Sequence, residues 1–284
     1  MDVRFDGIRT HGLRPTARVL SHGVTHRVGT SLRHRLHPLS GSRMTSSHAP
    51  DERLSSLLAS RDERVVFVHA GLRAVKDVFV RNPYVYLRNV LDTSFDSVLV
   101  PGFTPSFRQT GVYHKRYSRP EFGAFARCFL SDADHRTNDA IHSILVRGPY
   151  RFPCADHHDT FGPSGCYAQL ETDNVLIANV GTPWFVSTQH HFVEHQAEVP
   201  YNHPSIHRGT IYYENDASEP VVQRNYEYDL PACRSAGKIE RRLCRNGVMD
   251  VYDIDGCPVR FVGAADLHDV LCEAIETDPF YLVT

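Results

Sequence analysis

Apolar residues occur along this chain either in short continuous runs or three and four positions apart. The continuous runs are rich in branched and aromatic residues and predict strands buried on both faces; they span 65–68, 97–100, 141–146 and 175–180. Helical spacing, often after a proline that suits a first helical turn, predicts helices between them; these span 51–60, 82–91, 120–130, 163–170 and 187–197. Strands that alternate with helices predict an α/β fold.

The pattern changes after residue 200. Two strands, 211–213 and 221–228, flank the turn residues Asn215 and Asp216 and predict a hairpin. A helix at 238–244, strands at 248–253 and 259–262, and a last helix at 264–276 follow. We therefore expect one domain over 51–283, with a mixed central sheet flanked by helices and a late antiparallel hairpin or subdomain.

Residues 1–43 differ from the rest of the chain. They show no helical or strand period, and they carry eight Arg, five His and only two Asp. A basic arm for nucleic acid, a transit peptide, and translated sequence upstream of Met44 all fit this composition. We expect this segment to be an unstructured head outside the core.

The remaining chain is acidic and contains all of the protein's lysines, Lys76, Lys115 and Lys238. Such a surface argues against nucleic-acid binding by the folded body. No apolar run is long enough to cross a bilayer, and the N-terminus lacks the apolar stretch of a signal peptide. We expect a cytoplasmic protein without membrane contact, either a monomer or a homodimer.

The most informative segment follows the predicted strand 175–180. A loop from Gly181 leads into a polar helix, on which Thr188, His191, Glu194 and His195 share one side. Strand ends and helix starts converge at ligand sites in α/β proteins. His191 paired with Glu194 has the composition of a general base supported by a carboxylate, although a solvated helix face has it too.

The same helix permits a zinc site. His191, Glu194 and His195 match the pattern H-x-x-E-H, in which the two histidines bind zinc and the glutamate acts as base. A third ligand would come from elsewhere, with Glu273 and Glu276 as candidates. The run from Asp156 to Asp159 is a second His-rich segment that could hold a metal, whereas the seven cysteines form no CxxC pair.

Five segments, in order, resemble the antibiotic N-acetyltransferase family, whose best-known members are the aminoglycoside 3-N-acetyltransferases. The resemblance covers roughly 51–283, and the Thr-x-x-His-x-x-Glu helix is its most specific element. The segments are 66–72, 98–107, Arg136-Thr137 with Ser143, 188–194, and 263–267 with Asp278-Pro279. The resemblance implies this family's fold, which differs from the common GNAT fold.

The resemblance also implies an acetyl-CoA-dependent N-acetyltransferase that acts by direct attack on the thioester and uses no metal. His191 would be the base, Glu194 would orient it, and Thr188 would hydrogen-bond the thioester carbonyl or the substrate. The acceptor would be an amino group of an aminosugar, an aminoglycoside or a related amine, which the acidic body would attract. The residues expected to bind acetyl-CoA are His69, Ala70, Gly71 and Leu72 along the pantetheine arm, Arg73 and Arg136 at phosphates, and Thr104 and Ser143 nearby.

This sequence departs from the family pattern at some of these positions. Ala70 and Gly71 replace two serines, and Asp139-Ala140 replaces His-Pro. Three functions therefore stay open: the acetyltransferase, a zinc hydrolase built on His191, Glu194 and His195, and a non-catalytic relative that binds a small ligand.

Overall fold

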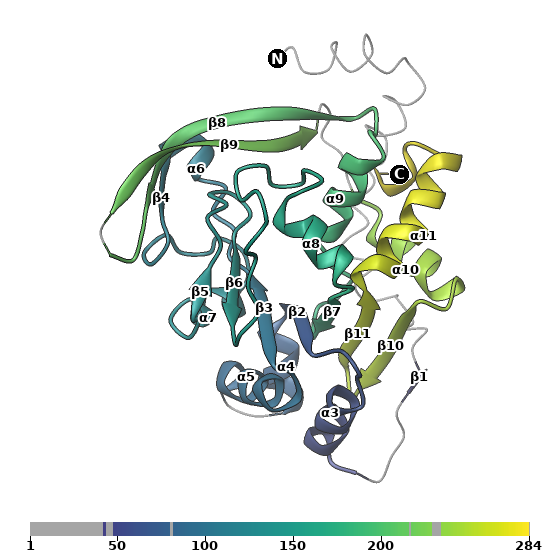
Figure 1. The fold of residues 1–284 in the computed structure, drawn as a ribbon. Helices are drawn as coiled ribbons and strands as arrows, with labels where there is room; N and C mark the ends of the chain where they lie inside the picture. The colour runs from purple at the N-terminus through teal and green to yellow at the C-terminus, as the bar shows by residue number, and fades with distance from the viewer. Residues whose placement is uncertain (1–41, 44–47, 80–81, 216, 229–233, 284) are drawn as a thin grey trace.

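The computed structural model describes residues 42–43, 48–79, 82–215, 217–228 and 234–283. The strands of its main sheet are β1 Ser42–Arg43, β2 Val65–Ala70, β3 Ser97–Pro101, β5 His135–Arg136, β6 Ile144–Arg147, β7 Leu176–Val180, β10 Met249–Ile254 and β11 Cys257–Gly263. They form one mixed sheet in the order β1-β10-β11-β7-β2-β3-β6-β5 (Figure 1). β2 runs parallel to both neighbours, β7 and β3, so the C-terminal ends of these strands lie at the same sheet edge.

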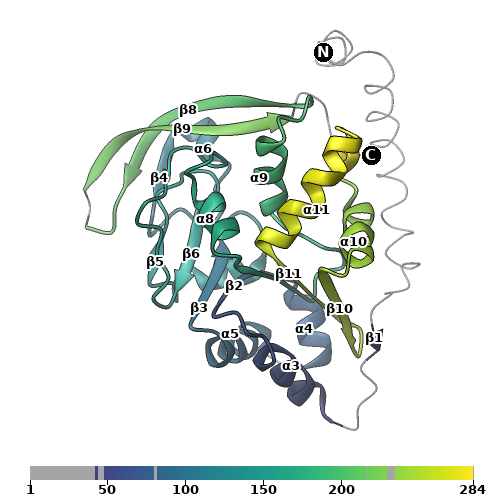
Figure 2. The same cartoon turned by 45° about the vertical axis from the view of Figure 1, so that its right-hand side comes forward.

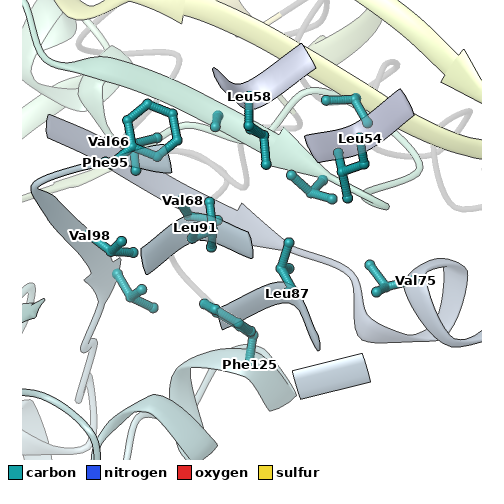
Figure 3. Packing of buried hydrophobic residues seen from close by; sticks show 14 of the residues in the cluster. Leu54, Leu58, Val66, Val68, Val75, Leu87, Leu91, Phe95, Val98 and Phe125 are labelled. Atoms are coloured by element: carbon teal, nitrogen blue, oxygen red, sulfur yellow. The ribbon is translucent and has the colours of Figure 1, made fainter. Parts of the chain in front are cut away.

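One face of the sheet is covered by four helices. These are α3 Pro50–Ala59, α4 Leu72–Val78, α5 Pro83–Ser94 and α7 Ala124–Phe129. Leu58 of α3 and Leu91 of α5 are fully buried in the same cluster as Val66 and Val68 of β2 (Figure 3). Because successive strand residues point to opposite faces, Phe67 and His69 lie on the other side of β2.

The other face is covered by α8 Cys166–Thr172, α9 Gln189–Gln196 and α11 Ala264–Thr277, with α10 Ala236–Arg245 packed against α11. Phe67 of β2 belongs to a buried cluster with Tyr167 of α8 and Phe192 of α9. The turned view shows α9 beside α11 above the sheet (Figure 2). This packing places α9 over the face that carries His69.

A second sheet arches over this side of the molecule. It consists of β4 Val112–His114, β8 Asn202–Tyr212 and β9 Ser218–Tyr228, with the short helix α6 Phe107–Thr110 beside it (Figures 1 and 2). β8 and β9 pair antiparallel along their whole length. The pair of strands β8 and β9, called the ribbon below, brings Tyr228 to α9, where the Tyr228 hydroxyl lies 3.1 Å from Nδ1 of His191.

The predicted fold class is confirmed: the sheet is mixed, helices flank it, and an antiparallel hairpin comes late in the chain. The hairpin is longer than predicted. Residues 202–210 were not predicted as a strand because they lack a run of β-branched residues, but they form one by pairing with β9. The helix predicted at 120–130 is shorter and follows Gly123, whose φ of +79° interrupts a helix. Helix α4 and the short strands β4 and β5 were not predicted.

The predicted head lies mostly outside the described residues, since residues 1–41 are not described. Its last two residues, Ser42 and Arg43, pair with Tyr252 and Asp253 at the edge of the main sheet. No helix within the described part of the chain is long and apolar enough to cross a bilayer.

Candidate active site

The loop between β7 and α9 is held by Asn179, a fully buried residue of β7. Its side-chain oxygen accepts hydrogen bonds from the Val186 amide at 2.7 Å and from the Thr182 hydroxyl at 3.0 Å. Its side-chain nitrogen donates to the Val186 carbonyl at 2.8 Å. Asn179 therefore fixes where α9 begins, and with it the position of every side chain on the first turns of that helix.

Arg260 supports the same loop from β11. Its guanidinium donates to the Thr182 carbonyl at 2.9 Å and lies 3.1 Å from a carboxylate oxygen of Glu240. Glu240 also accepts from the Phe185 amide at 3.3 Å. A buried, paired guanidinium orders a loop because leaving either charge unpaired would be costly.

His191 and Glu194 form a hydrogen-bonded pair on α9. Nδ1 of His191 lies 2.9 Å from Oε2 of Glu194, and 22% of the His191 side chain is exposed while Glu194 is fully buried. Two tyrosine hydroxyls also donate to the carboxylate, Tyr228 at 2.8 Å and Tyr201 at 3.0 Å. The carboxylate is thus saturated with donors and holds the imidazole in one orientation.

The other nitrogen of His191 faces Arg234. Nη2 of Arg234 lies 2.7 Å from Nε2 of His191 and 3.2 Å from the Tyr228 hydroxyl. Because a guanidinium has no lone pair to share, Nε2 is the acceptor. These partners assign His191 as the neutral tautomer with its proton on Nδ1, directed at Glu194.

The electrostatics of the pair agree with a neutral imidazole. Burial lowers the pKa of His191, Arg234 lowers it further, and Glu194 opposes both, leaving the pKa below 6.5. Burial raises the pKa of Glu194, but hydrogen bonds from His191 and Tyr228 and the charges around it bring the pKa below its ordinary value. The arrangement is a carboxylate and a neutral imidazole, which is what a general base requires, but the Nε2 lone pair accepts from Arg234 and becomes available to a substrate only when Arg234 moves away.

Two further histidines lie close to the dyad. His190, 3% exposed, has its ring centroid 4.2 Å from that of His191, and His69 at the end of β2 is near enough to lower the pKa of His190. Burial lowers the pKa of His69 to about 4. Nε2 of His69 and Nε2 of His190 are both buried without a hydrogen-bond partner among the described residues. Orphaned polar atoms of this kind leave hydrogen-bonding capacity for a bound ligand.

The end of β2 is pressed against the start of the loop. The Gly71 amide donates to the Val180 carbonyl at 2.8 Å, and a Cβ at Gly71 would lie 2.2 Å from the Gly181 carbonyl oxygen. A serine is therefore excluded at position 71 in this packing. Ala70 and Leu72 are half-buried beside it, and Arg73 is exposed in the first turn of α4.

Three predicted cofactor residues, Thr104, Arg136 and Ser143, form part of the scaffold instead. The guanidinium of Arg136 is 2% exposed and donates to the carbonyls of Gly102, Lys115 and Ser118 and to the hydroxyl of Ser143. Ser143 donates to the Gly102 carbonyl and Thr104 to the Ala140 carbonyl, both at 2.8 Å. Because these groups are buried and already paired, we correct the expectation that they bind the cofactor.

Thr188 precedes α9 and is 5% exposed. Its side chain lies close enough to the Tyr167 phenol to influence the pKa of that phenol, and its carbonyl accepts from the His191 amide at 2.9 Å. Thr188 is thus one turn before His191 on the same side of the helix, as the spacing predicted.

The zinc arrangement predicted from H-x-x-E-H is not formed. The His195 ring packs on Tyr226 with centroids 3.8 Å apart, close to Asp159 and Arg224, and is not part of the group that contains Glu194. Among the described residues, the one group with metal-ligand geometry is His190, His191 and Glu194. Both ring nitrogens of His191 and both oxygens of Glu194 already have hydrogen-bond partners there, and a guanidinium would face the ion, so these residues do not fit a zinc ion.

The other candidate ligands lie elsewhere. Glu273 pairs with Arg242 at 2.9 Å and Glu276 is exposed, both on α11. Nδ1 of His157 accepts from the Asn138 amide, and Asp159 pairs with Arg224. None of the four joins the His191 group.

Four residues at this site were missed from the sequence: Tyr201, Tyr228, Arg234 and His190. The first three lie 7 to 43 positions along the chain from the groups they touch. No motif connects them to α9, because the ribbon and the segment after it bring them there. His190 is adjacent to His191, but neighbouring helix positions point in different directions, so spacing excluded it from the predicted face.

Comparison with known proteins gives the family. A family model described as aminoglycoside 3-N-acetyltransferase matches residues 93–276, well over half of the chain. No match was found among curated protein sequences.

Solved structures show the same fold at low sequence identity. CoASH-bound AAC-IIIb has a TM-score of 0.67 at 15% identity, covering 83% of this chain and 97% of that one. A variant of AAC(3)-IVa in complex with a gentamicin has a TM-score of 0.63 at 16% identity, covering 84% and 93%. YokD from Bacillus subtilis has a TM-score of 0.62 at 13% identity, covering 81% and 100%.

Proposed function

Because the chain belongs to the aminoglycoside 3-N-acetyltransferase family, we propose that it transfers the acetyl group of acetyl-CoA to an amino group of an aminosugar, an aminoglycoside or a related amine. The observation that carries the proposal is the pair of His191 and Glu194, joined at 2.9 Å, which directs Nε2 of His191 away from the carboxylate; a substrate proton would reach Nε2 in place of its contact with Arg234. The fold-mates whose structures hold CoASH or a gentamicin support this choice of donor and acceptor.

The chemistry requires a base. An amine attacks a carbonyl carbon through a lone pair, which the ammonium form lacks, so the attacking nitrogen must lose a proton. Bound acetyl-CoA supplies the thioester that is attacked. Nε2 of His191 accepts the proton while the amine nitrogen replaces sulfur on the acetyl carbon, and Glu194 stabilises the resulting imidazolium through Nδ1–H. The proton then passes to the departing thiolate, and His191 is restored.

The end of β2 fits the donor. His69, Ala70, Gly71 and Leu72 lie beside the loop that leads into α9, and Nε2 of His69 is a buried atom without a partner among the described residues. The pantetheine arm carries amide groups that pair with such atoms. Arg73, exposed in the next turn, is available to a phosphate. Thr188 remains our candidate for the thioester carbonyl.

Calorimetry with acetyl-CoA tests the donor, and release of CoA in the presence of a panel of amines tests the transfer. We expect binding below millimolar concentration and CoA release that depends on an amine. Absence of binding at millimolar acetyl-CoA would contradict the transferase. Binding without turnover of any amine would instead identify a non-catalytic relative, and activity abolished by a chelator would favour the zinc hydrolase.

A further inference from the structure

Arg234 places its positive charge against a neutral ring and a hydroxyl group, not against a carboxylate of the described residues. Its guanidinium contacts the neutral Nε2 of His191 and the Tyr228 hydroxyl, while its Nε is buried without a partner. Within the described residues, no carboxylate lies at ion-pair distance from it. Guanidinium groups form their strongest contacts with carboxylates and phosphates, through two parallel hydrogen bonds. The side chain therefore retains unused capacity for an anion.

The carboxylates of the described residues around His191 are already engaged. Glu194 is fully buried and accepts from His191, Tyr201 and Tyr228. Glu227 on β9 lies between Arg108, at 3.6 Å, and His207, at 3.2 Å. A substrate with several ammonium groups would find these carboxylates taken and would meet the positive charge of Arg234.

A second cation adds to this field. Arg108 of α6 is close enough to His191 and to His142 to lower the pKa of both, and its Nε is buried without a hydrogen bond. Arg108 and Arg234 reach the dyad from different elements, α6 and the segment before α10. Arg108 is offset by Glu227 at 3.6 Å, so Arg234 is the guanidinium beside Nε2 of His191 whose charge remains available to an anion.

We infer that Arg234 binds an acid group on the acceptor, so that the acceptor is an amine that also carries a carboxylate or a phosphate. The inference rests on the proposed transferase function and narrows its substrate class. An acid group of opposite charge offers Arg234 two parallel, charge-assisted hydrogen bonds, whereas the neutral imidazole accepts a single one. Arg234 then moves from Nε2 to the acid, and the lone pair of Nε2 becomes available to the amine of the same molecule.

Three amines with one sugar skeleton test the inference at saturating acetyl-CoA. They are glucosamine, glucosamine 6-phosphate and glucosaminic acid, with gentamicin as the polycation. We expect kcat/KM for at least one acidic amine to exceed that for glucosamine by about 10-fold or more. The phosphate and the carboxylate probes show which acid is preferred. Equal or better use of glucosamine or gentamicin, or no acidic amine bound in calorimetry, overturns the inference.

Variants of Arg234 identify the residue responsible. Arg234→Gln should reduce the ratio of kcat/KM for the acidic amine to that for glucosamine by about 10-fold, and Arg234→Lys, which keeps the charge but loses the paired donors, should reduce it less. Arg241→Gln, on the exposed side of α10, is the matched control and should keep the wild-type ratio. An unchanged ratio in Arg234→Gln overturns the inference.

The two proposals fail separately. Acetylation of gentamicin in preference to acidic amines would keep the transferase and remove the acid-selective site. Failure to bind acetyl-CoA, together with binding of glucosamine 6-phosphate that Arg234→Gln weakens, would remove the transferase and keep the acid site.

Discussion

At His191, opposite charges act on the two ring nitrogens. Glu194 lies at Nδ1 and favours the protonated ring, whereas Arg234 lies at Nε2 and favours the neutral one. Glu194 thus strengthens His191 as a base, whereas Arg234 weakens it and occupies the lone pair of Nε2. Substitutions of the ring and of each neighbour separate these effects.

Removal of the imidazole should stop proton transfer. We expect His191→Ala to lower kcat by roughly 10²- to 10⁴-fold, with little change in acetyl-CoA affinity, because the ring acts on the amine. His195→Ala is the control, since that ring packs on Tyr226 outside the dyad. CoA release gives kcat, and calorimetry gives the affinity. A loss in His195→Ala as large as that in His191→Ala would contradict this assignment.

The acid limb of the pH profile should move in opposite directions in two variants. Only neutral His191 accepts a proton, so kcat/KM falls as pH decreases through its pKa, which lies below 6.5. Arg234→Gln removes a positive charge, raises this pKa and should shift the limb to higher pH. Glu194→Gln removes a negative charge, lowers the pKa and should shift the limb to lower pH. Shifts of the same sign would show that another group controls the limb.

At the scale of elements, the site depends on how closely β2 and β7 end beside each other. Gly71 and Gly181 approach so closely that a Cβ on either would lie within 2.6 Å of the other's carbonyl oxygen, and Gly181 has φ of +70°. The two glycines let the strand ends meet, and Asn179 then sets the path from β7 into α9. At position 71, backbone contact therefore takes the place of the serine side chain that the family resemblance implies.

Restoring the family's serines one at a time tests this packing. Gly71→Ser should destabilise the protein by about 1–3 kcal/mol, because the new Cβ meets backbone that has no room to move. Ala70→Ser adds a hydroxyl to a Cβ that is already accommodated and should change stability by far less. Urea unfolding measures both. Equal stability of the two variants would show that the strand ends can separate without cost.

Across the whole molecule, buried histidines make stability depend on pH. Burial lowers the pKa of His69 to about 4, and burial with nearby cations lowers that of His135 to about 4. Between about pH 4 and 6.5 the unfolded chain binds these protons and the folded protein does not, so stability falls as pH decreases. Asp139 acts in the opposite direction, since burial raises its pKa to about 6.

We expect the histidines to dominate and Tm to fall between pH 7 and pH 5. His69 alone should contribute on the order of 1–3 kcal/mol over its full range. Calorimetric unfolding scans at constant ionic strength measure the slope, and His69→Gln should make it shallower. A Tm that stays level or rises over this interval would show that Asp139 and other carboxyl groups outweigh the histidines.

The amino-acid sequence by itself determined the local elements and the central dyad. Buried runs and helical spacing predict β2, β3, β7 and most helices, because neighbours along the chain decide those preferences. Thr188, His191 and Glu194 share a helix face by spacing alone, and the family resemblance rests on the same residues.

Only the tertiary structure decided which distant groups complete the site. Arg234 contacts His191 across 43 positions and Tyr228 contacts Glu194 across 34, through a ribbon whose first half lacks the pattern of a strand. Arg136 looked like a phosphate ligand, yet its guanidinium is buried on backbone carbonyls. Spacing along a chain constrains neighbours within a few residues, whereas burial and pairing of a charge depend on every element packed around it.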